Sequence, residues 1–259
     1  MGQAAHLKVK ELLDNVAIVL VAPKYPENVG AAARAAMNMG ISQIILVRNE
    51  LPDDERMRKM ATHNAGHIID KIKRYDSVKE AVAPFGWVVG TSARQGRRRV
   101  AFNSPRQVMD ELLPLIGNNK VALLFGPEDR GLTNEDLQYC NQITTIPTAD
   151  FSSLNLAQAV AILCHELHFA LLNAVATGYT DFVPKQVESR ELEATYDRLE
   201  QVLRTIGYLK DTDYEYWMNN IRQFFGRVGL RTKEARVIRG LCKQFIWDRA
   251  QQRKTATDA

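Results

Sequence analysis

Three polar segments, two of them with glycine, each follow an apolar stretch of the sequence, and they hold the residues whose side chains could take part in chemistry. The first, NVGAAARAA, contains Asn28, Gly30 and Arg34, and this arginine lies in an otherwise apolar helical turn. The second, FGPEDRGL, places Glu128 beside a Gly-Pro turn, and the third is FSSLNLAQA. A charge among apolar residues needs a partner or a route to solvent, so Arg34 is surface-extended, ion-paired or functional.

Helix capping explains part of this pattern. Asn28 can cap the helix that follows the first apolar run, and Ser153 can cap the long helix that begins in the third segment. Capping by Ser153 does not require the neighbouring Asn155, which therefore becomes a candidate for another task. A fourth turn, GTSAR from Gly90 to Arg94, follows a further apolar run. Backbone groups in turns of this kind can bind a polar ligand without charged side chains.

Other chemistry is disfavoured by spacing. His165 and His168 are three residues apart inside the most apolar helix, whereas the metalloprotease signature needs two histidines four residues apart. His63 and His67 have that spacing, but no third ligand stands near them, so we expect no metal. Neither GxGxxG after the first strand nor GxxxxGK[ST] occurs. A standard dinucleotide site and a P-loop are therefore not expected.

The elements that position these turns are short, continuously apolar runs, which are typical of strands buried on both faces of a parallel sheet. The predicted strands are Val16–Ala22, Ile44–Val47, Trp87–Thr91, Val121–Phe125 and Ile143–Ile146. Ligands of open α/β sheets bind at the carboxyl ends of the strands. The sequence therefore predicts an α/β sandwich in which the four turns converge on one pocket.

Helices with readable ends lie between the strands. Ser104 and Pro105 are typical of a helix start, Gly117 of its end, and Thr133 with Asp136 forms a capping box. The segment from Leu154 to about Val175 predicts a long helix that is buried on most sides.

We expect a domain of residues 1–175, a linker of residues 176–188 around Gly178 and Pro184, and a small helical domain of residues 189–259. Three helices are predicted in that last part: one ending at Gly207, one from about Asp213 to Phe225 and one from about Thr232 to Arg249.

The positive charge is concentrated at the end of the chain. Lys and Arg number 34 against 30 Asp and Glu overall, but from Tyr216 to Ala259 there are 10 basic residues against 3 acidic ones. This is either a solvated helical surface or a patch that binds nucleic-acid phosphates. The absence of a secretory signal and of an apolar run of about 20 residues predicts a cytoplasmic protein without a membrane partner.

In their order and composition, NVGAAAR, LLFGPEDRGL and FSSLNLAQAVAI resemble the three motifs of the SpoU/TrmH-type SPOUT RNA 2′-O-ribose methyltransferases. The segments DRLEQVLRTIGYL and MNNIRQFFGRVGLRTKEARVIRGL resemble the C-terminal extension of the TrmJ branch, which methylates the ribose of nucleotide 32 in the tRNA anticodon loop. The resemblance implies a parallel SPOUT sheet whose C-terminal part forms a deep trefoil knot, S-adenosylmethionine as cofactor, tRNA as substrate, and an active site shared across a homodimer.

Residue roles follow from the resemblance, position by position. The cofactor-binding positions are Thr91, Ser92, Ala93, Gly126, Ile146, Ser153, Leu154 and Asn155. The catalytic positions are Arg34, Asn28, Glu128, Ser153 and Asn155. The expected RNA-binding residues combine the cluster after GTSAR with the basic tail: Arg97, Arg98, Arg99, Arg222, Arg227, Arg231, Arg236 and Arg239. A solvated loop explains the arginine cluster equally well.

The methyl transfer that the resemblance implies requires only two things of the protein. The enzyme aligns the ribose 2′ oxygen with an already activated methyl group and helps the hydroxyl lose its proton. A guanidinium stays protonated, so Arg34 would anchor a phosphate and stabilise the developing alkoxide rather than act as a base. Two alternatives stay open: the same reaction on ribosomal RNA or another tRNA position, and a non-catalytic RNA-binding or chaperone protein of this fold.

Overall fold

The computed structural model describes residues 3–48, 50, 52–93, 103–149 and 154–257. A single six-stranded sheet has the order β3-β2-β1-β5-β4-β6, and all neighbouring strands are parallel. The predicted α/β class with a parallel sheet is confirmed. In chain order the elements are α1 (Gln3–Leu13), β1 (Val16–Val21), α2 (Pro26–Asn38), β2 (Gln43–Val47), α3 (Asp54–Ile69), β3 (Lys73–Tyr75), α4 (Val78–Val82), β4 (Trp87–Thr91), α5 (Pro105–Ile116), β5 (Val121–Phe125), α6 (Asn134–Leu137), β6 (Gln142–Thr144), α7 (Leu156–Ala176), α8 (Ser189–Thr205), α9 (Tyr214–Val228) and α10 (Thr232–Thr257).

All five predicted strands are present, and the structure adds β3. That strand has the sequence KRY and pairs only with β2, at the edge of the sheet. An edge strand needs no apolar run because only part of its surface is covered. The pattern of buried strands therefore could not identify it.

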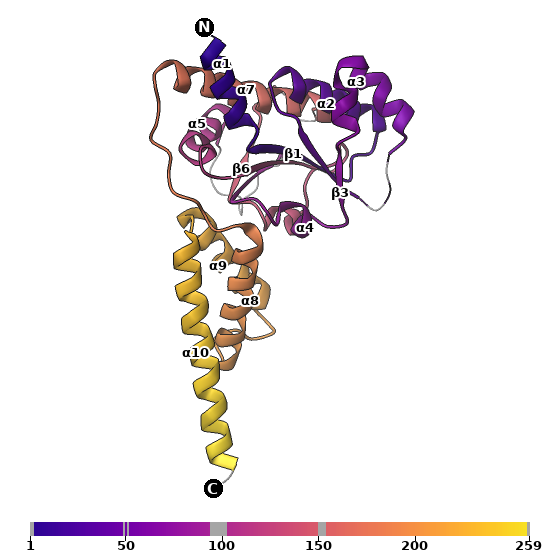
Figure 1. The fold of residues 1–259 in the computed structure, drawn as a ribbon. Coiled ribbons are helices and arrows are strands. Elements are labelled where there is room, and N and C mark those ends of the chain that lie inside the picture. Colours follow the sequence, from indigo (N-terminus) through magenta and orange to yellow (C-terminus); the bar gives the residue numbers. More distant parts are fainter. Residues whose placement is uncertain (1–2, 49, 51, 94–102, 150–153, 258–259) are drawn as a thin grey trace.

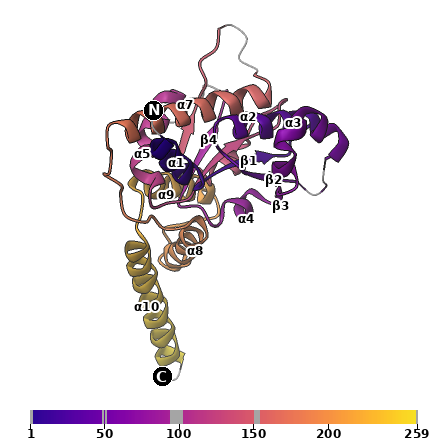
Figure 2. The same cartoon turned by 45° about the horizontal axis from the view of Figure 1, so that its top comes forward.

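Side chains of β1 alternate between two cores, one on each face of the sheet. Val16, Ile18 and Leu20 join the larger core, which is completed by α1, α2, α3, α5 and α7. Ala17 and Val19 join the smaller core, which contains residues of α4 and α6. Figure 1 and Figure 2 show the larger group of helices on one side of the sheet and α4 on the other. This is why the central strand is apolar at every position.

The predicted ends of α5 and the predicted start of α6 are confirmed. Ser104 caps α5, whose first helical residue is Pro105, and Gly117 stands at its C-cap. Thr133 and Asp136 form the predicted capping box of α6. These short-range signals are reliable because each is a hydrogen bond between residues three positions apart.

The helix α7 is less buried than the sequence predicted. Its inner face fills the larger core, but only 39% of its most apolar window is buried, and the Phe169 side chain is 48% exposed. By length and composition α7 could cross a membrane, and among the described residues it is the one helix of which this is true. The expectation that it is buried on most sides is wrong for a single copy of the chain.

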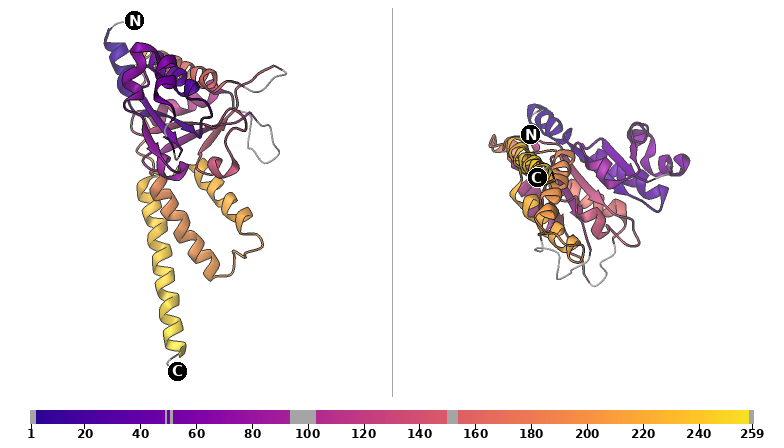
Figure 3. Two further views of the ribbon diagram at one scale, coloured as in Figure 1. Left: turned by 90° about the vertical axis from the view of Figure 1, so that its right-hand side faces the viewer. Right: turned by 90° about the horizontal axis from the view of Figure 1, so that it is seen from below.

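The three C-terminal helices form a separate group below the sheet, and α10 projects far from the body (Figure 1). Two views in Figure 3 show α8 and α10 side by side. The group is attached where the chain leads into β4: the Ser189 N–H donates to the Phe85 carbonyl and the Arg190 N–H to that of Ala83. The helical region therefore lies at the amino edge of the sheet.

The segment 176–188, predicted as a linker, is packed against the body. The Val183 N–H donates to the carbonyl of Pro114, and the Gln186 N–H donates to the Asn119 side chain. Gln186 also pairs with Arg231 in an isolated antiparallel bridge. The segment is thus bonded both to the sheet domain and to the C-terminal helical region.

Gly30 determines how closely α2 approaches α3. A Cβ atom at this position would lie 1.9 Å from the backbone oxygen of Met57 and 3.1 Å from the nitrogen of Ala61. The neighbouring Ala32 and Ala33 are fully buried as well. The small residues of this segment therefore let two helices pack closely.

Substituting Gly30→Ala should destabilise the protein by about 1–3 kcal/mol, because the obstructing atoms belong to the α3 backbone and cannot rotate away. Urea unfolding measures the loss. The control is Gly240→Ala on α10, where a Cβ meets nothing within 4 Å; alanine should leave stability equal or raise it by up to about 1 kcal/mol. Equal unfolding midpoints for the two variants would contradict the role given to Gly30.

Candidate active site

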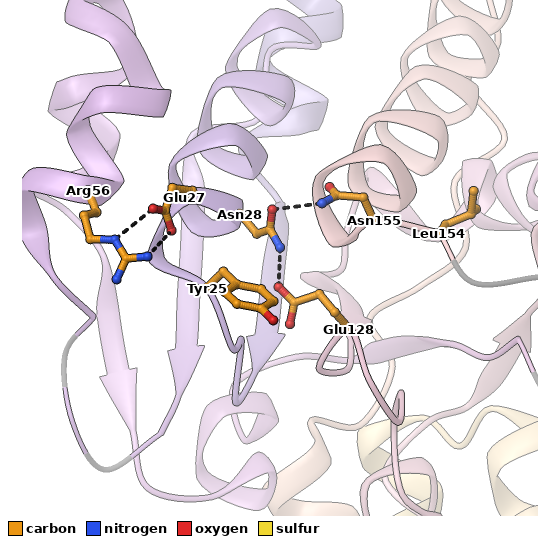
Figure 4. Close-up of a pocket in the computed structure, with 7 residues that line it drawn as sticks. All are labelled: Tyr25, Glu27, Asn28, Arg56, Glu128, Leu154 and Asn155. Carbon is orange, nitrogen blue, oxygen red and sulfur yellow. Dashed lines mark hydrogen bonds and ion pairs between the residues drawn. The ribbon is translucent and has the colours of Figure 1, made fainter.

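An open hollow of about 410 Å³ lies at the carboxyl edge of the sheet. Residues from all three sequence segments line it, together with one residue of α3, and Figure 4 shows them as sticks: Tyr25, Glu27, Asn28, Arg56, Glu128, Leu154 and Asn155. The chain after β1 and β5 and the start of α7 therefore converge, as the sequence predicted for this edge.

A chain of hydrogen bonds joins the three segments. The Asn28 Nδ2 group donates to Glu128 Oε1, and the Asn155 Nδ2 group donates to Asn28 Oδ1 at 2.9 Å. At one end the backbone N–H of Lys24 donates to Glu128 Oε2 at 2.9 Å. At the other end the N–H of Ala157 donates to Asn155 Oδ1 at 2.9 Å. Because backbone donors fix both ends, the orientation of every amide in the chain is determined.

Two capping predictions are corrected by this geometry. Asn155, not Ser153, is the N-cap of α7, where it forms a capping box with Gln158. Asn28 is not a cap: α2 begins at Pro26 after Tyr25, and the Asn28 side chain points to Glu128 instead. Asn155 thus both caps α7 and takes part in the site, since its Oδ1 serves the helix and its Nδ2 serves Asn28.

The residues predicted to bind the cofactor follow three neighbouring strands. Thr91 ends β4 and donates its hydroxyl to the Leu124 carbonyl on β5, and the Ser92 N–H donates to the Thr144 carbonyl on β6. Gly126 directly follows β5, where a Cβ would lie 2.2 Å from Leu132 N. Ala93 is exposed, Ile146 packs against the larger core and Leu154 lines the hollow. Main-chain groups at these three strand ends lie on one edge.

Arg34 is not brought into the hollow of its own chain. It lies on α2 seven residues after Glu27, which is about 10 Å farther along the helix axis. The side chain is exposed, and among the described residues it has no ion pair or hydrogen bond. A buried ion pair, one of the structural explanations for this arginine, is therefore not supported.

Some predicted site residues fall outside the described part of the chain. These are Ser153, from the third segment, and the arginine cluster Arg97, Arg98 and Arg99. Their assignments stay predictions.

The sequence analysis missed an ion pair on the outer wall of the hollow. Arg56, near the start of α3, holds Glu27 through Nε–Oε1 at 2.8 Å and Nη2–Oε2 at 3.1 Å. The hydrogen bond from Arg56 lowers the pKa of the Glu27 carboxyl. Both side chains are more than a third exposed, so the pair adds little stability. No motif signalled it, because the partners are 29 residues apart.

The basic residues of the C-terminal region are of two kinds. Arg227, Arg231 and Arg236 are exposed, and Arg239 is partly so. Arg222 is instead internal.

Arg222 makes a two-bond ion pair with Glu193, with 2.8 Å between Nη2 and Oε2, and its guanidinium lies 4.5 Å from the Tyr196 ring centroid. Burial opposes the charge of Arg222, but the hydrogen bonds to Glu193 outweigh it and raise the pKa. Arg222 is therefore engaged inside the helical region, and we no longer expect it to contact RNA.

The hollow combines two neutral amides, one aromatic ring and two carboxylates, of which Glu27 is paired with Arg56 and Glu128 is not. Such a set can hold hydroxyl groups and a ribose by hydrogen bonds. Among the described residues no group of three His, Cys, Asp or Glu side chains lies close enough to hold a metal ion. The arrangement is suited to positioning a polar substrate beside main-chain loops.

Two protein-family matches cover most of the chain. Residues 15–165 match the SpoU rRNA Methylase family, and residues 190–256 match the C-terminal domain of tRNA methyltransferase TrmJ. The two matches divide the chain close to the expected domain boundary.

Individual proteins extend this similarity. A tRNA (cytidine/uridine/adenosine-2′-O-)-methyltransferase TrmJ of Pseudomonas aeruginosa is 36% identical over 241 residues, which cover 89% of this chain and 93% of that protein. A tRNA (cytidine/uridine-2′-O-)-methyltransferase TrmJ of Escherichia coli K12 is 33% identical, covering 89% and 94%. The crystal structure of TrmJ from Z. mobilis ZM4 superposes with a TM-score of 0.75 at 30% identity, covering 88% of this chain and 97% of that one.

Removal of the internal arginine should destabilise the helical region strongly. Arg222→Ala leaves the Glu193 carboxylate, whose side chain is only 7% exposed, without its partner, at a cost of about 3–5 kcal/mol. Arg222→Lys should recover only part of this, because an ammonium cannot make the two parallel bonds. Thermal unfolding followed by circular dichroism measures both.

The control is Arg227→Ala on the same helix, at an exposed position, which should change stability by no more than about 0.5 kcal/mol. An Arg222→Ala variant as stable as this control would show that the ion pair contributes nothing.

Proposed function

The chain belongs to the SpoU methylase family, and on that premise we propose that it transfers a methyl group from S-adenosylmethionine to a ribose 2′-hydroxyl of tRNA, at nucleotide 32 of the anticodon loop. The observation that carries the proposal is the hydrogen-bond chain Glu128–Asn28–Asn155, which unites the three motif segments at the carboxyl edge of the sheet. The C-terminal match supports tRNA over ribosomal RNA. A tRNA substrate also agrees with the cytoplasmic location expected from the sequence.

The loop residues fit the cofactor that the family implies. Three adjacent strand ends, at Thr91, Gly126 and Ile146, present backbone groups on one edge, where ligands of open α/β sheets bind, and Gly126 lets its loop close tightly on the backbone of Gly131 and Leu132. We assign this edge, with Ser92, Ala93, Ser153, Leu154 and Asn155, to S-adenosylmethionine. The cofactor supplies a methyl group that its sulfonium has already activated. The trefoil knot of the family is part of the same proposal.

Within the hollow, the protein's task is to hold the ribose and lower the cost of ionising its 2′-hydroxyl. The Asn28 and Asn155 amides each keep one N–H beyond the bonds that fix them, and Glu128 keeps free lone pairs. These groups orient the hydroxyl for in-line attack. The Arg34 guanidinium anchors a phosphate and stabilises the developing alkoxide, while water or phosphate accepts the proton.

A second copy of the chain completes the site. Arg34 lies about 10 Å farther along the α2 axis than Glu27, its side chain is exposed, and it is not among the residues that line the hollow of its own chain. On α7, the Phe169 side chain is exposed in a single copy, and a two-fold partner packed against this helix would cover it. Together these features support a homodimer in which Arg34 serves the partner's hollow.

The activity is tested with purified protein, S-adenosylmethionine and total tRNA, followed by mass spectrometry of the nucleosides and of ribonuclease fragments that contain the anticodon loop. Wild-type protein should form a 2′-O-methyl nucleoside at position 32. Arg34→Ala should abolish transfer without loss of stability, since the side chain is exposed and unpaired among the described residues, and Arg34→Lys should not rescue it.

Calorimetry with a chelator present provides the control, because cofactor affinity should stay within a few-fold in both Arg34 variants. A lysine variant with near-normal activity would show that a point charge suffices. No methyl transfer by the wild type to any tRNA would refute the proposed function.

The exposed arginines of the C-terminal helices should bind tRNA phosphates. Replacing Arg227, Arg231, Arg236 and Arg239 by glutamine should weaken tRNA binding and flatten the slope of log K against log salt by up to about 3.6, at about 0.7–0.9 for each phosphate contact. Filter binding between 50 and 300 mM salt, roughly the range in which such slopes are measured, gives the result.

Lys8→Gln with Lys10→Gln is the matched control, because these exposed residues lie on α1, at the other end of the molecule (Figure 1). Equal slopes for the control, the quadruple variant and the wild type would show that these arginines do not contact tRNA phosphates and form only a solvated surface.

A further inference from the structure

Tyr25 is the only aromatic residue among those that line the hollow, and the fold holds its backbone firmly. Pro26 follows it and restricts it to extended conformations, and Tyr25 has φ −112° and ψ 123°. The N–H of Lys24 donates to Glu128, and the N–H of Asn28 donates to the Tyr25 carbonyl at 3.0 Å. The backbone at Tyr25 is therefore held between two members of the hydrogen-bond chain of the site, Glu128 and Asn28.

Folding alone does not explain this side chain. Tyr25 is 46% exposed and belongs to neither of the two sheet cores. Among the described residues its hydroxyl has no hydrogen-bond partner, and the ring's one cation contact is Lys24 Nζ, 5.6 Å from the centroid. Lys24 in turn lies 3.8 Å from Asp129. An exposed ring with an unused polar tip at the mouth of a polar hollow is available to a ligand.

The proposed substrate supplies a group of matching chemistry. A ribose held against Asn28, Glu128 and Asn155 belongs to a nucleotide whose base must leave its own stack to let the sugar enter. Unstacked bases in RNA–protein complexes are commonly stacked on aromatic side chains. Figure 4 shows the Tyr25 ring beside Glu128, with Asn28 above.

Resting on the proposed function, we propose that Tyr25 is the platform on which the base of the target nucleotide stacks while its ribose is methylated. The other planar group on the wall, the Arg56 guanidinium, is already bound to Glu27 through two of its nitrogens. Every base has a π-face, so stacking by itself does not select one base. Tyr25 would thus position the nucleotide without restricting its identity.

The test compares Tyr25→Phe with Tyr25→Leu, a matched pair of apolar side chains of which only the first has a π-face. The substrate is an anticodon stem-loop of tRNA with pyrrolocytidine, whose fluorescence is quenched by stacking, at the methylated position. Tyr25→Leu should lower kcat/KM roughly 5- to 150-fold and leave the bound base brighter, whereas Tyr25→Phe should stay within about threefold of the wild type with a quenched base.

Two results would overturn the inference. The first is a leucine variant with the wild-type rate and the wild-type emission. The second is a phenylalanine variant as impaired as leucine, because this would assign the effect to the hydroxyl rather than the ring. Melting temperatures within about two degrees of the wild type, expected for an exposed side chain, exclude misfolding.

The wild type separates this inference from the proposed function. Wild-type methylation together with a fully active Tyr25→Leu variant removes only the stacking role. Failure of the wild type to methylate any tRNA removes both.

Discussion

The site depends on one constraint: six parallel strands end at the same edge, and a line of side-chain amides ties the loops of that edge together. The bond between Asn28 and Glu128 spans 100 residues of sequence, and the bond between Asn155 and Asn28 spans 127. The first bond requires β1 and β5 to be paired, and the second requires the start of α7 to lie beside α2. Because main-chain N–H groups anchor both ends, the geometry of the hollow is set by the fold and not by side-chain rotamers alone.

The small residues of the first motif serve this constraint indirectly. Gly30 brings α2 against the backbone of α3, and the two helices then present Glu27 and Arg56 to each other on the wall of the hollow. In the sequence Gly30 is one small residue among alanines, and nothing there identifies the partner of its close approach. That partner is a helix, and the consequence for the site is the position of its outer wall.

The strands, the α5 and α6 caps and the three C-terminal helices were predictable because each depends on residues close in sequence. Edge strand β3 was not, since polar residues suffice where only one neighbour pairs. The cap of α7 was assigned to Ser153 instead of Asn155 because two polar residues two positions apart can each cap one helix, and only the fold distinguishes them. Arg222 was misassigned because a count of charges cannot reveal a buried partner such as Glu193. Local signals thus identify the elements, and long-range contacts decide the roles.

The hollow and the C-terminal helices lie at opposite ends of the parallel strands, which constrains any substrate that contacts both. The hollow follows the carboxyl ends of β1 and β5, whereas α8 is attached beside Phe85, just before the amino end of β4. A five-residue strand spans about 17 Å, so the substrate must extend around the sheet or reach the helices of a second copy. A folded tRNA is large enough for either path. The exposed Arg34, which does not line the hollow of its own chain, and the exposed Phe169 on α7 favour the second path, because one partner could contact both.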